Sequence, residues 1–232
     1  MIVVFYNEPW TVLLRCVYSI YNRSPRSLLH EIILVNDNSS MPELYEPLEK
    51  YVAEKFNGKV KVFRNPTRLG LIVSRLEGAQ KASAEVIIFL DSHMEVTTGW
   101  FVPLLDPIRS NRKTATVPVI DGISAIDLKY ETFGDNTNGG FDWNLRYQYF
   151  SFVENERSAD REPFTLAAMT GGAYAINREY FFELGGYDKG MFLYNGENYE
   201  LSFKLHLCGG NMLKVPCSRV GELCFVKGNC KK

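Results

Sequence analysis

Residues 85–96 read EVIIFLDSHMEV, a short apolar run that ends on the polar residues 91–93 (Asp-Ser-His). A continuous apolar run of this length, rich in β-branched residues, is typical of a strand that is buried on both faces. Similar runs lie upstream at residues 2–6 and 31–35, and each is followed by polar residues. The pattern predicts a mostly parallel sheet with helices on both faces, an α/β fold.

Amphipathic segments alternate with these runs through the first half of the chain. Apolar side chains at helical spacing predict helices, and further apolar runs predict strands. We expect helices at 10–21, 42–56, 70–82 and 100–110, and strands at 60–63 and 115–120.

The rhythm breaks after residue 121, where Gly, Asn and Asp become frequent up to residue 165. No linker is evident, so the sequence predicts one domain with an irregular second half. In that half we expect a strand-like run at 166–176, helices at 178–184 and 197–207, and a last strand at 212–215.

Composition excludes several classes of protein. The 232 residues are 46% apolar and 23% charged, with a net charge of −1, as in ordinary globular domains. Such a balance argues against a nucleic-acid binder with a general basic surface, and no apolar stretch approaches the ~20 residues of a membrane helix. Four of the five cysteines follow residue 207, and they predict either disulfides in a secretory compartment or buried thiols.

Polar residues follow each strand of the first half, and ligands bind α/β sheets beyond the carboxyl ends of their strands. Asp91 and His93 stand two apart on an extended segment, so both side chains can point the same way. One carboxylate and one imidazole suit a divalent cation such as Mn²⁺. Neither a GxGxxG nor a GxxxxGK[ST] loop is present, which disfavours a dinucleotide or P-loop enzyme and favours a sugar-nucleotide transferase.

A series of longer motifs makes this reading more specific. They occur in order over nearly the whole chain: FYNE (5–8), HEIILVND (30–37), RLGLIVSR (68–75), FLDSHMEV (89–96), PVIDGIS (118–124), GGFDW (139–143), TGGAYAI (170–176), NGENYELSFKLHLCGG (195–210) and PCSRVG (216–221). On these motifs the chain resembles the catalytic domain of the polypeptide N-acetylgalactosaminyltransferases, the enzymes that begin mucin-type O-glycosylation.

The resemblance implies a GT-A glycosyltransferase fold, UDP-GalNAc as donor, Mn²⁺ as cofactor, a protein Ser or Thr as acceptor, and retention at the anomeric carbon. It implies one catalytic domain over residues 1–232, with a nucleotide-binding half (1–121) and a donor-sugar and acceptor half (122–232). The family works in the Golgi lumen on a membrane anchor, usually with a lectin domain. We expect neither the anchor nor the lectin domain within these residues.

The resemblance also implies roles for residues of the first half. Asp37 and Arg68 match positions that contact the uridine, and Asp91 and His93 match the metal-binding pair. Glu222 stands where the family has the histidine that completes the metal site.

Further roles fall in the second half. Gly171 and Gly172 match glycines beside the donor sugar, and Tyr194 and Asn198 belong to the motif that borders it. Glu197 matches the acidic residue close to the transferring sugar, where a carboxylate can stabilise developing positive charge. Without the resemblance, Glu197 reads as a first-turn helix acid favoured by the helix dipole.

Several positions depart from the family pattern, and they leave two alternatives open. The departures are Val4, Val73, Thr170, Tyr194 and Glu222. They cluster around donor and metal, so a non-catalytic paralogue that binds a nucleotide or a partner is the first alternative. An inverting polysaccharide synthase is the second, but its QxxRW motif is absent. Cys208 and Cys217 match family cysteines whose partners fall elsewhere, so they are either free or re-paired with Cys224 and Cys230.

Overall fold

The computed structural model of the chain describes residues 1–132, 137–151, 161–191, 193 and 196–224. The first half contains β1 (Ile2–Phe5), α1 (Trp10–Arg23), β2 (Ile32–Asn36), the 3₁₀ helix η1 (Pro42–Leu44), α2 (Glu46–Lys55), β3 (Val60–Arg64), α3 (Leu71–Lys81), β4 (Val86–Asp91), β5 (Met94–Val96), α4 (Phe101–Ser110) and β6 (Thr114–Ser124). The second half contains β7 (Tyr130–Glu131), β8 (Thr137–Phe141), β9 (Tyr147–Ser151), β10 (Phe164–Thr165), β11 (Ala173–Asn177), α5 (Arg178–Glu183), α6 (Glu197–Leu207) and β12 (Asn211–Cys224).

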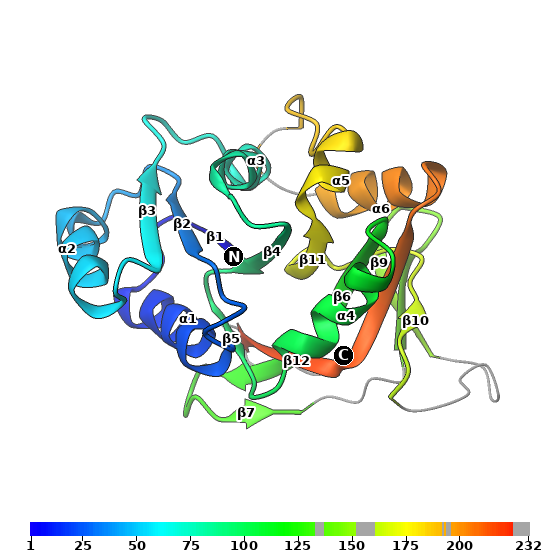
Figure 1. The fold of residues 1–232 in the computed structure, drawn as a ribbon, viewed down its shortest axis with the longest axis horizontal. Helices are drawn as coiled ribbons and strands as arrows, with labels where there is room; N and C mark the ends of the chain where they lie inside the picture. The colour runs from blue at the N-terminus through cyan, green and yellow to red at the C-terminus, as the bar shows by residue number, and fades with distance from the viewer. Residues whose placement is uncertain (133–136, 152–160, 192, 194–195, 225–232) are drawn as a thin grey trace.

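One large mixed sheet organises the molecule. Its strand order is β3-β2-β1-β4-β11-β6-β12-β10, from the left to the right of Figure 1. The four strands β3, β2, β1 and β4 are parallel, whereas β11 runs antiparallel to both β4 and β6. Strand β12 is parallel to β6 and also pairs with the short strand β5. The carboxyl ends of β1, β2 and β4 therefore meet at one edge.

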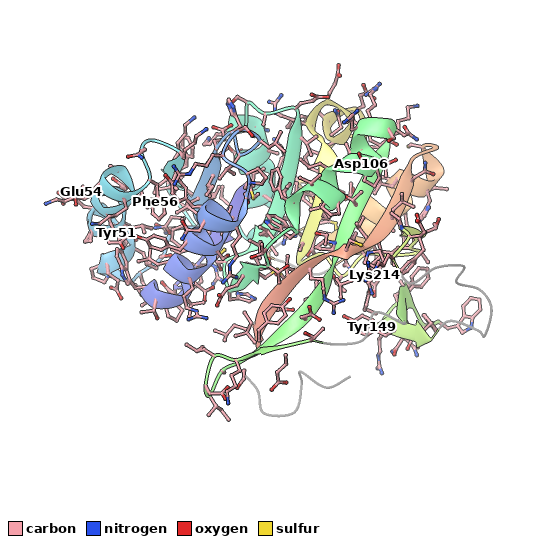
Figure 2. All side chains as sticks on the ribbon, turned by 60° about the horizontal axis from the view of Figure 1, so that its bottom comes forward. Tyr51, Glu54, Phe56, Asp106, Tyr149 and Lys214 are labelled. Carbon is pink, nitrogen blue, oxygen red and sulfur yellow. The ribbon has the colours of Figure 1, made fainter. Side chains whose placement is uncertain are left out.

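Helices cover both faces of this sheet. Successive strand residues point to opposite sides, and since both sets are apolar, both faces must be buried. Val3 and Phe5 of β1 join the core packed against α1, α2 and α4, while Ile2 and Val4 join the core packed against α3, α5 and α6. In Figure 1, α3, α5 and α6 lie along the top and α1 lies below. An aromatic contact links the end of α2 to α1: Phe56, the residue after α2 that Figure 2 labels, has its ring centroid 4.9 Å from that of Tyr18 in α1.

The α/β expectation is confirmed, and the differences have local causes. The predicted helix at 42–56 is divided at Tyr45, whose backbone leaves the helical region before α2 begins at Glu46, with Pro47 in its first turn. The strand-like run at 166–176 is a strand only from Ala173, since Gly171 adopts a φ of +90°. The last strand continues to Cys224, beyond an irregularity between Val215 and Arg219.

Residues 122–165, expected to be irregular, contain short strands. Strands β8 and β9 form a separate antiparallel ribbon, and the GGFDW motif (139–143) occupies the end of β8 and the start of the turn that follows it. Strand β6 continues past residue 121, so the main sheet crosses the predicted boundary between the halves. Among the described residues, no helix has the length and apolarity to cross a bilayer.

Candidate functional site

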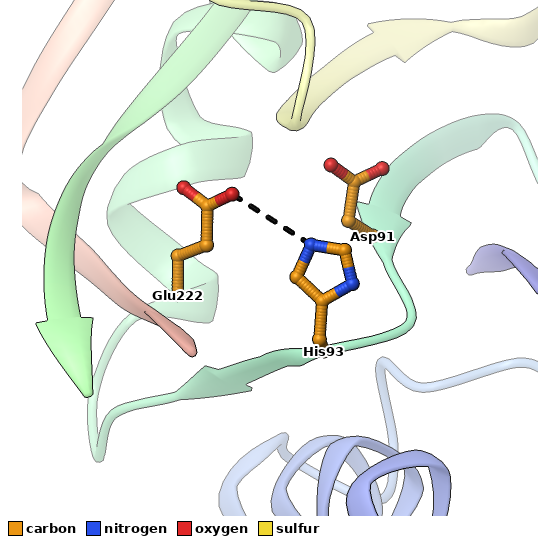
Figure 3. Close-up of side chains that lie close together, drawn as sticks. All are labelled: Asp91, His93 and Glu222. Carbon is orange, nitrogen blue, oxygen red and sulfur yellow. Dashed lines mark ion pairs between the residues drawn. The ribbon is translucent and has the colours of Figure 1, made fainter. Parts of the chain in front are cut away.

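Three potential metal ligands meet at the carboxyl end of β4 (Figure 3). Asp91 ends this strand, and the turn into β5 presents His93. Strand β12 pairs with β5 in a register that sets Glu222 opposite Met94. One ligand atom from each of Asp91, His93 and Glu222 lies within 4.8 Å of the others. Carboxylate oxygens with an imidazole nitrogen form a donor set that suits a divalent cation of the Mn²⁺ kind.

A third carboxylate, that of Glu8, lies behind the imidazole ring. Glu8, just beyond β1, has Oε2 3.3 Å from Nδ1 of His93 and accepts a hydrogen bond of 2.5 Å from the Ser92 hydroxyl. On the other side, Nε2 of His93 lies 3.7 Å from Glu222 Oε1. A carboxylate behind a ligating histidine is a common way to fix its ring and tautomer. The sequence placed Glu8 at this edge but did not assign it to the site.

The two carboxylates decide the charge of His93. Burial works against the imidazolium, but the hydrogen bonds that it donates to Glu222 and Glu8 outweigh burial and raise the pKa of His93 to about 10. The same contacts with His93 and Ser92 lower the pKa of Glu8 against the effect of its burial. The metal-free ring is therefore an imidazolium at neutral pH, and a cation that binds Nε2 must displace a proton.

A buried arginine lies between Asp91, one of the potential metal ligands, and Glu197. Arg75 of α3 is 2% exposed and donates from Nη2 to Asp91 Oδ1 over 2.7 Å. Its Nη1 lies 4.0 Å from Glu197 Oε1, at the first position of α6. Burial raises the pKa of Asp91, although Arg75 and His93 oppose this. Sequence reasoning missed Arg75, whose signal was a charge at helical spacing between Ile72 and Ala79 on an apolar face.

Two glycines leave room beside these side chains. A Cβ on Gly172 would stand 3.1 Å from Asp91 Oδ2 and 2.7 Å from the Met94 side chain. A Cβ on Gly171, where φ is +90°, would stand 3.1 Å from the Asn198 side chain and 3.6 Å from Glu197 Oε1. The structure thus brings the predicted glycine pair to the same place as the predicted acidic groups. Any larger residue here would fill that space.

Asn198 and Tyr194 complete the residues predicted around the donor. Asn198 donates from Nδ2 to the carbonyl of Met169 over 3.0 Å and so holds the chain that leads into Gly171. Tyr194 lies outside the described residues.

The predicted uridine residues lie at the ends of β2 and β3. Asp37 is buried, and its carboxylate accepts from Asn65 Nδ2 and from the backbone N–H groups of Leu69 and Gly70, over 2.8–2.9 Å. These bonds tie the loop before α3 to the end of β2. Arg68, at the surface of that loop, stacks its guanidinium 3.8 Å from the ring centroid of Tyr6.

One of the described cysteines lies next to this site: Sγ of the buried Cys16 donates to the carbonyl of Asp91 over 3.7 Å. Cys16, Cys208 and Cys217 are free thiols. The side chain of Cys224 and the whole of Cys230 lie outside the described residues.

Comparisons with known proteins agree with this geometry. The family profile described as Glycosyl transferase family 2 matches residues 1–185. The chain is 46% identical over 225 residues to human polypeptide N-acetylgalactosaminyltransferase 10, and 47% identical over 223 residues to N-acetylgalactosaminyltransferase 6 of Drosophila melanogaster. Each alignment covers 96% of this chain but only 37% and 33% of the relative. The chain therefore spans about a third of the length of these relatives.

Solved structures show the same fold. A crystal structure of GalNAc-T7 with UDP, GalNAc and Mn²⁺ is 43% identical and superposes with a TM-score of 0.94, over 98% of this chain and 43% of that one. The Staphylococcus aureus protein TarS, at 14% identity and a TM-score of 0.64, matches 96% of this chain and 36% of its own, and shows the fold alone. This chain has the GT-A fold, is similar to the polypeptide N-acetylgalactosaminyltransferases, and belongs to glycosyl transferase family 2.

Proposed function

We propose that this chain is the catalytic domain of a polypeptide N-acetylgalactosaminyltransferase. It would transfer GalNAc from UDP-GalNAc to a Ser or Thr hydroxyl of a protein, with retention. The proposal rests above all on the meeting of Asp91, His93 and Glu222 beside Gly172 and Glu197, in a chain similar to such enzymes. Residues 1–121 would bind the nucleotide, and residues 122–232 the donor sugar and the acceptor.

The metal assignment follows from the donor set. Asp91, His93 and Glu222 would hold Mn²⁺, the cation found in the GalNAc-T7 structure. When bound, Mn²⁺ supplies positive charge that neutralises the diphosphate leaving group. Glu8 orients the His93 ring from behind through its Nδ1, so that Nε2 faces the metal position.

The remaining residues bind and orient the donor. Asp37 shapes the uridine end by fixing the loop before α3, and Arg68 lines it. Gly171 and Gly172 leave the space that the sugar needs, and Asn198 holds them in place, next to Tyr194. Glu197 is 7% exposed, and its Oε2 has no hydrogen-bond partner among the described side chains. A carboxylate oxygen in this state can accept from sugar hydroxyls and stabilise positive charge at the anomeric carbon.

The cellular setting follows from the same likeness. We place the protein in the Golgi lumen, where family members act, with protein acceptors as its partners. In that compartment the cysteines near the end of the chain can form disulfides.

One observation favours a second function, a paralogue that binds UDP and metal without turnover. Glu222 occupies the position of the family histidine, and together with Glu8 it keeps His93 protonated. Both features weaken a metal site.

Incubation with UDP-GalNAc, Mn²⁺ and a mucin-like peptide separates the two functions. A glycopeptide product supports the transferase. Tight Mn²⁺-dependent UDP binding with no glycopeptide supports the non-catalytic paralogue, and absence of both contradicts the site assignment itself.

A further inference from the structure

The guanidinium of Arg75 lies between two carboxylates that come from distant parts of the chain. Its Nη2 donates to Asp91 Oδ1 at 2.7 Å, and its Nη1 lies 4.0 Å from Glu197 Oε1. Asp91 ends β4 and Glu197 begins α6, while Arg75 belongs to the second turn of α3. Three elements that do not follow one another in sequence therefore meet at one planar group.

Aromatic side chains confine this guanidinium. Its Cζ lies 5.9 Å from the ring centroid of Phe89. Tyr174 and Tyr187, whose hydroxyls are 2.5 Å apart, are fully buried and both contribute to the electrostatic environment of Arg75. With only 2% of its surface exposed, the side chain has no open direction into which to rotate. The orientation of the planar Arg75 guanidinium is thus fixed relative to the sheet.

The unpaired atoms distinguish a site role from a purely structural one. Nη1 of Arg75 and Oε2 of Glu197 are both buried and have no hydrogen-bond partner in the described part of the chain. An ion pair kept only for the fold normally has its remaining donors satisfied within the protein, because an unsatisfied buried donor is costly. Here Nη1 of Arg75 lies 4.0 Å from Glu197 Oε1, and the same carboxylate oxygen lies 3.6 Å from the Cβ position of Gly171.

Arg75 also decides which oxygen of Asp91 is available. Oδ1 is held by Nη2, while Oδ2 points toward Gly172, whose Cβ position lies 3.1 Å away. One oxygen is thereby reserved for the arginine, and the other faces the site.

We propose that Arg75 is a positioning residue that holds the carboxylates of Asp91 and Glu197 at a fixed separation and orientation. The inference rests on the proposed function, which assigns Asp91 to the metal and Glu197 to the donor sugar. Arg75 acts through these two groups, so its effect on the site should depend on both of them.

The test uses Arg75→Lys, with Arg178→Lys as the matched control. Arg178 of α5 donates to the carbonyls of Ala79 and Gln80 in the last turn of α3, so it binds the helix of Arg75 through backbone groups and not through carboxylates. Lysine keeps the charge but lacks the planar fork that two carboxylates require. We expect Arg75→Lys to melt close to the wild-type temperature, yet to bind UDP with Mn²⁺ about tenfold more weakly by calorimetry, whereas the control binds as the wild type does.

Kinetics supply the second readout. Arg75→Lys should lower kcat by roughly 10²-fold, with a smaller change in KM for UDP-GalNAc, because orientation matters most in the transition state. In a Glu197→Gln background the same change should lower kcat by less than about threefold, since one of its two partners is gone. Arg75→Met, which removes the charge, should be worse than Arg75→Lys in both assays.

Three results would overturn the inference. The first is a UDP–Mn²⁺ affinity of Arg75→Lys within about twofold of wild type. The second is a double variant, with Glu197→Gln, in which the losses of kcat from the two single changes simply multiply. The third is a loss of UDP–Mn²⁺ affinity in the Arg178→Lys control equal to that in Arg75→Lys. A wild type that binds UDP–Mn²⁺ but transfers nothing refutes the transferase alone, and the binding assay still decides the role of Arg75. A wild type that binds no UDP–Mn²⁺ overturns both proposals.

Discussion

Glu222 is the residue at which the proposed metal site differs most from the family pattern. It adds a negative charge where a diphosphate is to bind, and it raises the pKa of His93. Both effects oppose binding of a metal–nucleotide pair, although a carboxylate oxygen is itself a good ligand for Mn²⁺. We therefore expect a single substitution at Glu222 to strengthen the binding of metal and nucleotide.

Glu222→His should bind UDP with Mn²⁺ several-fold more tightly than the natural chain. The substitution removes a like charge that costs about 1–4 kcal/mol beside the diphosphate at intermediate dielectric, and it relieves His93 of one of its two acidic partners. Titration of both proteins with UDP at fixed Mn²⁺ measures the difference. If the histidine variant binds no better, the weakness lies instead at Val4, Val73 or Tyr194.

Glu197 tests whether an acid at a helix start acts on substrate or only on the helix. Glu197→Gln should leave UDP affinity within about threefold and lower the transfer rate by roughly 10²–10³, the size expected for one preorganised electrostatic group. Glu200→Gln is the matched control, because Glu200 also lies in the first turn of α6 and pairs with Lys204. Equal transfer rates in the two variants would show that Glu197 only stabilises the start of the helix through its interaction with the helix dipole.

The start of α3 shows how one element ties the nucleotide end of the site to the segment before Glu197. Gly70 has a φ of +86°, donates its N–H to Asp37 and forms a parallel bridge with Leu193. A Cβ on Gly70 would stand 2.6–3.0 Å from backbone atoms of Leu193. Both the backbone conformation and this close approach require glycine.

Gly70→Ala should destabilise the fold by about 2–4 kcal/mol, because backbone strain adds to a collision with atoms that cannot move alone. Gly99→Ala is the control, since Gly99 has a similar φ of +81° but nothing within 4 Å of its Cβ position. Gly99→Ala should lower the free energy of unfolding only by the backbone strain, about 1 kcal/mol. Urea unfolding measures the loss of stability in both variants. Equal losses would show that the backbone at Leu193 moves aside and that the close approach to Gly70 adds no cost.

Glu31 links elements at the opposite end of the sheet. It precedes β2, and its carboxylate accepts a hydrogen bond of 2.7 Å from the ammonium group of Lys61 in β3. It also accepts hydrogen bonds of 2.8 Å from the backbone N–H and the hydroxyl of Ser83. These donors overcome the effect of burial and lower the pKa of Glu31 from 4.5 to about 2. A carboxylate with a depressed folded-state pKa stabilises the fold above its unfolded pKa, and the contribution is lost as the pH falls toward 2.

Glu31→Gln should therefore lower the free energy of unfolding at pH 7 by up to about 3 kcal/mol, because lowering the pKa of the carboxyl group from 4.5 to about 2 stabilises the folded state. The difference from wild type should shrink steadily between pH 4.5 and 2. The control Glu49→Gln removes an exposed pair with Arg64 and should change stability little. Urea unfolding across this pH range measures both, and a pH-independent loss would contradict the linkage.

At the scale of the whole molecule, the proposed metal site joins two parts of the chain that are distant in sequence. Asp91 and His93 come from the β4–β5 turn, whereas Glu222 comes from the last strand. Strand β12 is held in place by β6 on one side and β5 on the other. A ligand bound here stabilises the folded state without binding the unfolded chain.

UDP with Mn²⁺ should therefore raise the melting temperature. At a hundred times Kd the expected stabilisation is about 2.7 kcal/mol. Asp91→Asn should abolish the metal-dependent part, because it removes a charged ligand that the diphosphate cannot replace. Thermal scans with UDP, Mn²⁺ or both measure the shift, and an Asp91→Asn protein that is stabilised as strongly as wild type would show that the metal binds elsewhere.

Local sequence determined most of the secondary structure. The apolar runs of β1, β2 and β4 and the helical spacing of α1 and α6 fix where strands and helices form, because the period of burial is a local property. The turn after β4 likewise follows from Asp91-Ser92-His93. The family motifs then named residues in both halves of the chain that the structure brings together around Asp91.

The tertiary structure decided what depends on neighbours distant in sequence. An apolar run does not reveal its direction, so the antiparallel course of β11 and the length of β12 followed only from pairing. The roles open to Arg75 and Glu8 followed from burial and from the carboxylate and imidazole groups that surround them. Hydrophobic periodicity says which side chains leave water, but only packing decides which charges meet there, and charge pairing sets the chemistry of this site.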